Sequence, residues 1–278
     1  MNKQFILNFT PTGMIPTKAM TPHVPILVPE IVEQVTEAAG QGANMAHVHA
    51  RNPQDESPTY EKEIYADIIR GIRAKNKDLV ICVSTSGRNF PEFEKRSACL
   101  DLTGDLKPDF GSLTLSSLNF NKQASINSPE MIQALAKKML DNGIKPELEV
   151  FDLGMINYAH YLIQKGLIKP PYYFNLILGN IACAQANLLS LGLMIKELPP
   201  DSIWSVGGIG GAQLKMNAIG IIEGGGVRIG LEDNIYLDSE RTHLATNSEL
   251  VRRIIGIAKV MGRVPYSHRE ARKILGVA

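Results

Sequence analysis

The sequence predicts a single (β/α)8 barrel spanning residues 1–278, and three observations predict it. A barrel of this class takes about 250 residues, so the length suits one closed barrel. Hydrophobic residues make up 44% of the chain, enough to bury one large core. A short apolar strand followed by an amphipathic helix recurs along the whole chain, which is typical of a parallel sheet. The eight repeats favour a closed barrel over an open, doubly wound sheet.

Each predicted strand is a short apolar run that ends in polar or glycine residues. The run FILNFT opens the series, and MAHVH and LVICVS follow it in the same form. Runs of four to eight apolar residues bounded by turn residues are typical of buried strands. The strands are predicted at 5–10, 45–49, 79–84, 110–115, 146–151, 172–178, 203–206 and 227–230.

The predicted helices fill the segments between these strands. The fourth has the clearest start, because Ser128 can cap the helix and Pro129 suits its first turn. A further short helix is predicted after Pro265. The main helices are predicted at 29–40, 59–76, 91–101, 129–142, 155–165, 182–198, 212–223 and 248–261.

Composition argues against several classes of partner. The 29 Lys and Arg residues nearly balance the 28 Asp and Glu residues, and the Lys and Arg residues are not grouped in a basic block. Both observations argue against nucleic acid and membrane partners. The apolar run at the N-terminus is too short for a signal peptide. Cys82, Cys99 and Cys183 lie far apart without CxxC spacing. Scattered cysteines indicate reduced thiols, so we expect a cytoplasmic protein.

Two histidines at the end of the second strand predict a metal site. His47 and His49 are two residues apart, so both imidazoles point to the same face of the strand. In a (β/α)8 barrel, catalytic groups gather at the C-terminal ends of the strands. Neutral imidazole is a good ligand for zinc. The alternative is that the pair only fills a layer of the barrel, where branched aliphatic residues are usual.

The end of the eighth strand brings charged residues to the same rim. Glu232 is the expected third ligand, because two histidines and one carboxylate form an open, catalytic type of zinc site. Asp233 would then be a free carboxylate beside the metal, paired with Arg228. The alternative is that Arg228 and Asp233 form an ordinary surface ion pair.

Hydroxyl groups follow the third and fourth strands. Ser84, Thr85, Ser86 and Gly87 form one cluster, and Thr114 lies at the end of the next strand. Hydroxyls and backbone N–H groups can bind a substrate carboxylate without competing for the metal. Turn and capping chemistry explains the first cluster almost as well.

Two further segments are candidates with open alternatives. Glu147 and Glu149 lie on one face of the fifth strand, and Glu149 is the candidate for a catalytic acid or base. The run GGIGG at residues 207–211 follows the seventh strand, and Gly208 and Gly210 would let backbone amides approach a phosphate at a helix N-terminus. A tight strand-to-helix turn explains the same glycines.

Taken together, the motifs resemble the β-keto acid cleavage enzyme family nearly from end to end. In order, they are TPTG, TPHVP, AHVHAR, STSGR, GSLTLSSLNF, ELEVFD and VRIGLEDN. The resemblance implies a (β/α)8 barrel whose zinc is bound by His47, His49 and Glu232. It also implies a catalytic triad at Ser84, Arg228 and Asp233, a substrate-binding hydroxyl at Thr114, and a homo-oligomer, often a tetramer.

The resemblance also implies the reaction. A β-keto acid condenses with acetyl-CoA, and the adduct is cleaved to acetoacetate and a new acyl-CoA. Asp233, oriented by Arg228 and Ser84, would remove the C2 proton. The glycines at 207–211 would be available for a phosphate of coenzyme A.

The loop after the first strand bears on the substrate. An amino-substituted substrate would need a carboxylate near its tail, yet the loop PTGMIP offers Met14 and Ile15 and no acidic residue. If this loop lines the tail pocket, the substrate tail is expected to be uncharged and mainly apolar.

Three rival functions remain open at this point. A metal-dependent lyase would use the same groups without acetyl-CoA. An amidohydrolase-like hydrolase would place HxH after the first strand and add His or Asp ligands after later strands. Here HxH belongs to the second strand, and strands five to seven end without His. A non-catalytic protein with a structural metal would need a closed, four-ligand site.

Overall fold

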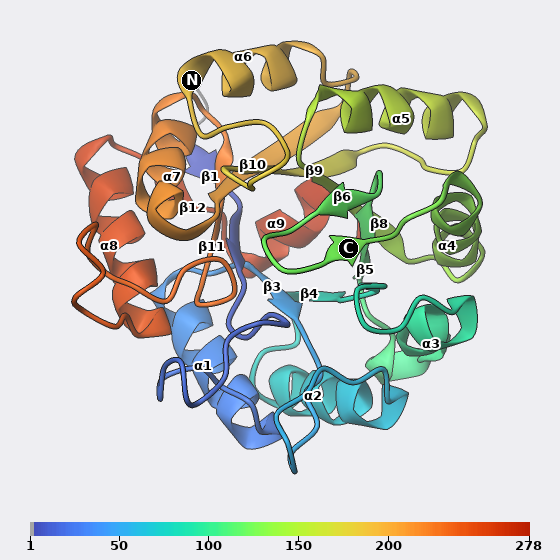
Figure 1. The fold of residues 1–278 in the computed structure, drawn as a ribbon, viewed down its shortest axis with the longest axis horizontal. Helices are drawn as coiled ribbons and strands as arrows, with labels where there is room; N and C mark the ends of the chain where they lie inside the picture. Colours follow the sequence, from blue (N-terminus) through green and yellow to red (C-terminus); the bar gives the residue numbers. More distant parts are fainter. Residues whose placement is uncertain (1–2) are drawn as a thin grey trace.

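The computed structural model describes residues 3–278 and shows a closed barrel of eight parallel strands. Around the barrel the strands run in the order β10, β11, β2, β3, β4, β5, β8 and β9, and helices surround them (Figure 1). The predicted fold class is therefore confirmed. The barrel strands are β2 (Leu7–Phe9), β3 (Met45–Val48), β4 (Val80–Val83), β5 (Phe110–Thr114), β8 (Lys145–Val150), β9 (Tyr172–Leu178), β10 (Ser202–Gly208) and β11 (Gly226–Ile229).

The helices form the outer layer because each has one apolar face. In α1, for example, Ile31, Val35 and Ala38 are buried and recur with helical spacing. The larger helices are α1 (Val28–Gln41), α2 (Lys62–Lys75), α4 (Pro129–Asp141), α5 (Leu153–Gln164), α6 (Leu188–Lys196), α7 (Gln213–Ile222) and α8 (Asn247–Val260). As predicted, Ser128 caps α4, its hydroxyl accepting from the Met131 N–H.

Several short strands and helices differ from those predicted from the sequence. The first predicted strand divides, because β1 (Gln4–Phe5) leaves the barrel and pairs with β12 (Val264–Pro265). The predicted helix at 91–101 is a short α3 (Phe93–Ser97) followed by a 3-10 turn. A hairpin of β6 (Leu118–Asn119) and β7 (Ala124–Ser125) was not predicted at all.

Two predicted helix starts were also wrong. Helix α2 begins at Lys62 because the chain before it is extended, with the Thr59 N–H donating to the Ala50 carbonyl. Helix α6 begins at Leu188 instead of residue 182 because Asn187 caps it, its side chain accepting from Ser190 N–H. The preceding segment, 179–187, is a loop that Asn180 ties to the hairpin by donating to the Asn119 carbonyl.

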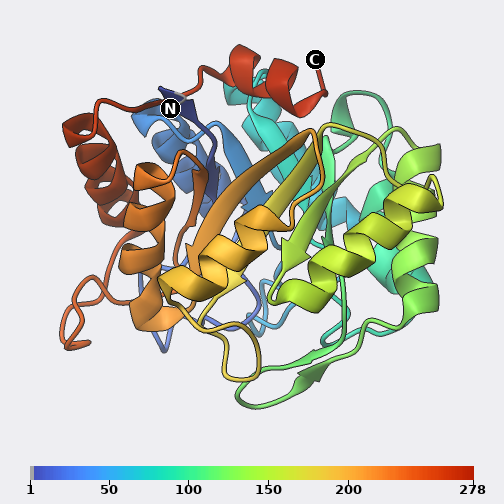
Figure 2. The same cartoon turned by 90° about the horizontal axis from the view of Figure 1, so that it is seen from above.

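The two ends of the barrel differ. Helix α9 (His268–Leu275), β1 and the C-terminus lie at one end, and the β6–β7 hairpin projects beyond the other (Figure 2). Ala271 and Leu275 of α9 are buried in a cluster with Ile6, Met45 and Phe110. The N-terminal end of the barrel is thus filled with side chains, and the C-terminal end, the mouth, is left for chemistry.

The structure also describes the cysteines and the apolar character of the helices. Cys82, Cys99 and Cys183 are all free thiols. Within residues 3–278, none of the helices has both the length and the apolar character that crossing a bilayer requires.

Candidate active site

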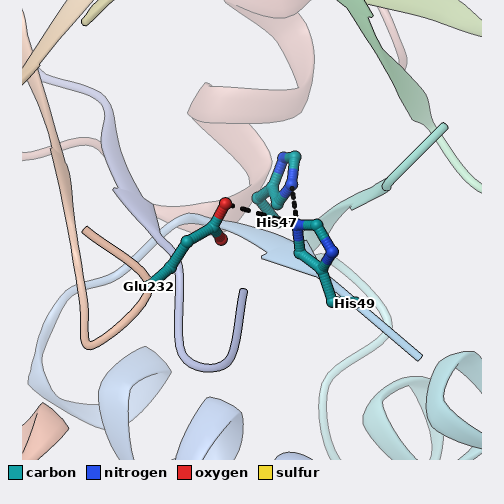
Figure 3. A group of neighbouring side chains, drawn as sticks. All are labelled: His47, His49 and Glu232. Atoms are coloured by element: carbon teal, nitrogen blue, oxygen red, sulfur yellow. Dashed lines mark hydrogen bonds and ion pairs between the residues drawn. The ribbon is translucent and has the colours of Figure 1, made fainter. Parts of the chain in front are cut away.

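The mouth brings His47, His49 and Glu232 together although Glu232 lies far from the histidines along the chain (Figure 3). His47 and His49 come from the end of β3, and Glu232 from the loop after β11. The two Nε2 atoms face one another at 3.0 Å, and His49 Nε2 lies 3.3 Å from Glu232 Oε1. The side chains are between 1% and 14% exposed, so all three are mostly buried.

These distances fit ligands of one metal ion. Zinc binds imidazole nitrogen at about 2.0–2.1 Å, so two tetrahedral ligands lie about 3.3 Å apart. Glu232 Oε2 is buried and finds no hydrogen-bond partner among the described residues. An orphaned, buried carboxylate oxygen costs free energy that a cation would recover. The donor set therefore fits a divalent metal with open positions.

Glu147 orients the first histidine. Its Oε1 lies 2.8 Å from His47 Nδ1, and its Oε2 accepts from Asn8 Nδ2 at 3.0 Å. Because Nδ1 is engaged by a carboxylate, the lone pair of Nε2 points into the mouth, as in many zinc sites. The sequence placed Glu147 on the inner face of its strand but gave it no role.

Cys82 also lies near His47 and Glu147, which makes a second possible ligand group. Burial raises the pKa of the Cys82 thiol well above its usual range, and the charge of Glu147 adds to this. In this second group, Glu147 Oε1 is already engaged by His47 Nδ1, whereas the Nε2 atoms of His47 and His49 face one another beside Glu232. The group containing Glu232 is therefore the better metal site.

Arg228 lies at the centre of a group of carboxylates in the mouth. It is buried, and its guanidinium faces four carboxylates at once. The nearest nitrogen–oxygen distances are 2.7 Å to Glu232, 3.0 Å to Asp233, 3.3 Å to Glu149 and 3.5 Å to Glu147. The predicted Arg228–Asp233 pair is therefore present, and it is buried instead of lying on the surface.

The closely spaced charges in the mouth shift the pKa values of several of its side chains. Burial acts to raise the pKa of Glu232, but Arg228 and the two histidines hold it well below its usual value. Burial opposes protonation of His47, yet the charges of Glu147 and Glu232 raise its pKa to about 9. Burial raises the pKa of Asp233 to about 6 against the pull of Arg228. Carboxylates outnumber guanidinium groups here, and the same negative field attracts a cation.

The predicted hydroxyl cluster lies beside the metal ligands. Ser84, Thr85 and Ser86 line one pocket together with His49 and Met14. Ser84 Oγ accepts from the Ser86 N–H at 3.3 Å. Within residues 3–278, no hydrogen bond joins Ser84 to Arg228 or Asp233, so its place in a triad stays a prediction.

The other predicted residues have defined positions. Thr114 donates to Glu149 Oε2 at 2.7 Å, which links it to Arg228 through Glu149. Gly87 packs on the buried Arg96, because an added Cβ would lie 2.4 Å from Nη1 of that arginine.

The glycine turn after β10 serves the mouth by holding Asp233. The Gly210 N–H donates to the Asp233 carbonyl at 2.7 Å, and Gly210 has a φ of +58°. An added Cβ at Gly208 would lie 2.6 Å from the Ala212 backbone. These contacts give both glycines a structural reason, and their binding of a phosphate stays a prediction.

A profile of the beta-keto acid cleavage enzyme family matches residues 4–277 of this sequence. The chain belongs to this family. A 3-keto-5-aminohexanoate cleavage enzyme from Fusobacterium nucleatum is 35% identical over 279 residues, covering 100% of this chain and 99% of the relative. A 3-oxoadipate:acetyl-CoA acetyltransferase from Cupriavidus necator is 34% identical, covering 100% of this chain and 96% of the relative.

Solved structures agree on the architecture of this β-keto acid cleavage enzyme family member. ObcA in a binary complex with oxaloacetate superposes with a TM-score of 0.80 at 20% identity, covering 93% of this chain and 68% of ObcA. At this identity the likeness speaks for the shared barrel alone.

Proposed function

We propose that this protein is a zinc-dependent enzyme that condenses a 3-oxo acid with acetyl-CoA and cleaves the adduct to acetoacetate and a new acyl-CoA. Family membership supports the reaction type, and the names of the Cupriavidus necator relative and others include acetyl-CoA as a substrate. The observation that carries the proposal is the His47, His49 and Glu232 cluster, joined through Arg228 to Asp233.

His47, His49 and Glu232 are the residues that would hold the metal. When bound there, zinc supplies a Lewis acid that polarises the 3-oxo group and makes the C2 proton more acidic. Glu147 holds His47 in the correct tautomer, and Arg228 holds Glu232 from the other side.

Asp233 is the proposed general base. Its carboxylate is fixed by Arg228 Nε and by the Gly210 N–H on its backbone carbonyl, so it is pre-oriented before substrate arrives. It takes the C2 proton, and the C2 electron pair then forms a bond to the thioester carbonyl carbon while coenzyme A leaves as thiolate. The thiolate attacks the former 3-oxo carbon, the C2–C3 bond breaks, and the proton returns to C2.

The products balance the substrates: acetoacetate contains C1 and C2 of the 3-oxo acid plus the acetyl group, and the remaining acyl group leaves on coenzyme A. Ser84, Thr85, Ser86 and Gly87 are proposed to bind the substrate beside His49, with Met14 facing the same pocket. Glu149, which pairs with Arg228, is proposed as a further catalytic acid or base, and Thr114, which donates to Glu149, as a substrate-binding hydroxyl. We also propose a homo-oligomer and a cytoplasmic location.

The proposed function has a direct test. The purified protein is incubated with acetyl-labelled acetyl-CoA and a panel of 3-oxo acids, and labelled acetoacetate is measured. The proposal requires label in acetoacetate that depends on both substrates. Cleavage of a 3-oxo acid without acetyl-CoA would instead favour a metal-dependent lyase.

A further inference from the structure

Arg88 occupies a fixed position at the mouth that the mechanism above does not use. It follows the Ser84–Gly87 cluster after β4, where Gly87 lies against the buried Arg96. Arg96 donates to the Thr85 carbonyl at 2.9 Å and to Asn127 Oδ1 at 2.8 Å. These contacts tie the turn to the base of the β6–β7 hairpin, so the direction of the following side chain is set by the fold.

The Arg88 guanidinium lies between the hairpin and the barrel mouth. Its central carbon is 3.7 Å from the centroid of the Phe120 ring, and Phe120 packs edge-on against Phe151 at 5.8 Å. Asn89 Oδ1 accepts from Gln123 Nε2 across the same gap at 3.4 Å. Stacking on an aromatic face positions a guanidinium while leaving its N–H edge available for an acceptor.

This edge has no acceptor in the part of the chain that the structure describes. Among residues 3–278, none accepts a hydrogen bond from the Arg88 side chain, and its Nε is buried. Burial lowers the pKa of Arg88, while the charges of Glu232 and Glu149 act in the opposite direction and show that it faces the same mouth. Those two carboxylates are already engaged by Arg228.

A guanidinium whose buried Nε has no acceptor is costly, so a bound anion that supplies one would be favoured. The planar fork of arginine matches a carboxylate, which can accept two parallel hydrogen bonds. Every 3-oxo acid carries a carboxylate. We propose that Arg88 binds a carboxylate of the 3-oxo acid substrate, an inference that rests on the proposed function.

Two carboxylates could occupy this position, and the choice sets the substrate class. One is the C1 carboxylate that all 3-oxo acids share. The other is a second carboxylate at the far end of a 3-oxo dicarboxylic acid, which would make the tail anionic, in contrast to the uncharged tail expected from Met14 and Ile15. Met14 lines the pocket with His49, but Ile15 is 52% exposed and so contributes little to an enclosed tail pocket.

A matched pair of substrates separates the two sources. 3-Oxohexanoate and 3-oxoadipate have the same chain length and differ by the second carboxylate. Their binding to the zinc-loaded protein is measured by calorimetry without acetyl-CoA, for wild type, Arg88→Met and Arg88→Lys. Arg70→Met serves as the control because Arg70 is exposed on α2 and pairs with its helix neighbour Asp67.

Loss of a charge-assisted hydrogen-bond pair is expected to weaken binding by at least about tenfold in Arg88→Met, with partial recovery in Arg88→Lys. Equal weakening for both acids assigns Arg88 to the C1 carboxylate. Weakening for 3-oxoadipate alone assigns it to the tail and predicts a dicarboxylic substrate. Arg70→Met is expected to bind like wild type.

The proposal is overturned if Arg88→Met folds, keeps its zinc and binds both acids as tightly as wild type, or if only the KM for acetyl-CoA rises. It is also overturned if wild type binds neither acid. Because binding needs no turnover, an Arg88 effect without any acetoacetate formation would contradict the proposed function and leave the carboxylate site standing.

Discussion

The two ends of the barrel contain buried ion-pair groups of opposite composition. At the closed end, one buried carboxylate meets two arginines: Asp109 accepts from Arg73 at 3.2 Å and from Arg272 at 2.9 Å, and it also accepts from the Ile81 N–H. At the mouth, one buried arginine meets four carboxylates, those of Glu147, Glu149, Glu232 and Asp233.

This difference indicates which end of the barrel is suited to bind a charged ligand from solution. At the closed end, Asp109 has partners for both of its oxygens, so its charge is compensated within the protein. The mouth has an excess of negative charge, an unpaired Glu232 oxygen and an unpaired Arg88 nitrogen. The His47, His49 and Glu232 group lies at this end of the barrel. We therefore expect a cation beside Glu232 and an anion beside Arg88.

Removing a metal ligand is expected to have the largest effect. His49→Ala leaves one histidine and one carboxylate, so the protein should lose its zinc and with it all measurable transfer activity. Metal content by mass spectrometry and acetoacetate formation are measured together. The control is His160→Ala, because His160 is outside the mouth and contacts the Glu197 carbonyl. A His49→Ala protein that retains stoichiometric zinc would contradict the assigned ligand set.

The second prediction separates metal binding from proton transfer. Asp233→Asn keeps a similar shape and can still accept from Arg228, but it cannot take a proton. Zinc content should be unchanged, and kcat should fall by about 10²- to 10⁴-fold. An exposed acid, Asp238→Asn, is the control. Full activity in Asp233→Asn would remove it from the role of general base.

Gly13 offers a smaller change at the same ligand. An added Cβ at Gly13 would lie 2.5 Å from Glu232 Cγ, so Gly13→Ala should displace Glu232 and lower zinc affinity by about 10- to 100-fold. Gly13 has a φ of +64°, which is strained for alanine on its own.

Gly104→Ala is the matched control for that strain. Gly104 has a φ of +60° and nothing within 4 Å of an added Cβ. Competition with a chelating dye measures zinc affinity in both variants. Equal affinity in the two would show that contact with Glu232 does not matter.

The smallest effect on chemistry is expected at the closed end. Asp109→Ala leaves the buried Ile81 N–H without its acceptor and should lower the free energy of unfolding by about 1–3 kcal/mol. Activity at 25 °C should stay at the wild-type level, because the change lies at the opposite end from the ligands. Asp141→Ala, an exposed partner of Lys137 on α4, should change stability by less than about 0.5 kcal/mol. Denaturant melts and initial rates test both statements, and a large loss of activity in Asp109→Ala would show that the two ends are coupled.

Much of this mouth could be predicted because strand periodicity fixes direction. Two residues apart on one strand, His47 and His49 had to point the same way, and closure of the barrel brought the end of the eighth strand to meet them. The motif resemblance then assigned Glu232. The structure added Glu147, whose partner His47 lies 100 positions away, at a separation that local patterns do not register.

The parts that were not predicted depend on tertiary contacts. The strands of the β6–β7 hairpin are only two residues long, too short to predict from a repeat, and the hairpin is held by Asn127, Arg96 and the loop at 179–187. The start of α6 was misplaced because the preceding residues are apolar enough to continue a helix, yet Asn187 caps it later. Arg88 was read only as part of the STSGR motif, since its lack of a partner is visible only once every neighbour is placed.

The packing of α9 across the bottom of the barrel has a kinetic consequence. Ala271 and Leu275 of that helix pack with Ile6, Met45 and Phe110, so we expect ligands to reach the His47, His49 and Glu232 group from the mouth. If both substrates of the proposed reaction enter there, the one that binds first lies beneath the second. The proposed function then predicts ordered binding, with the small acid innermost and the bulky thioester outermost.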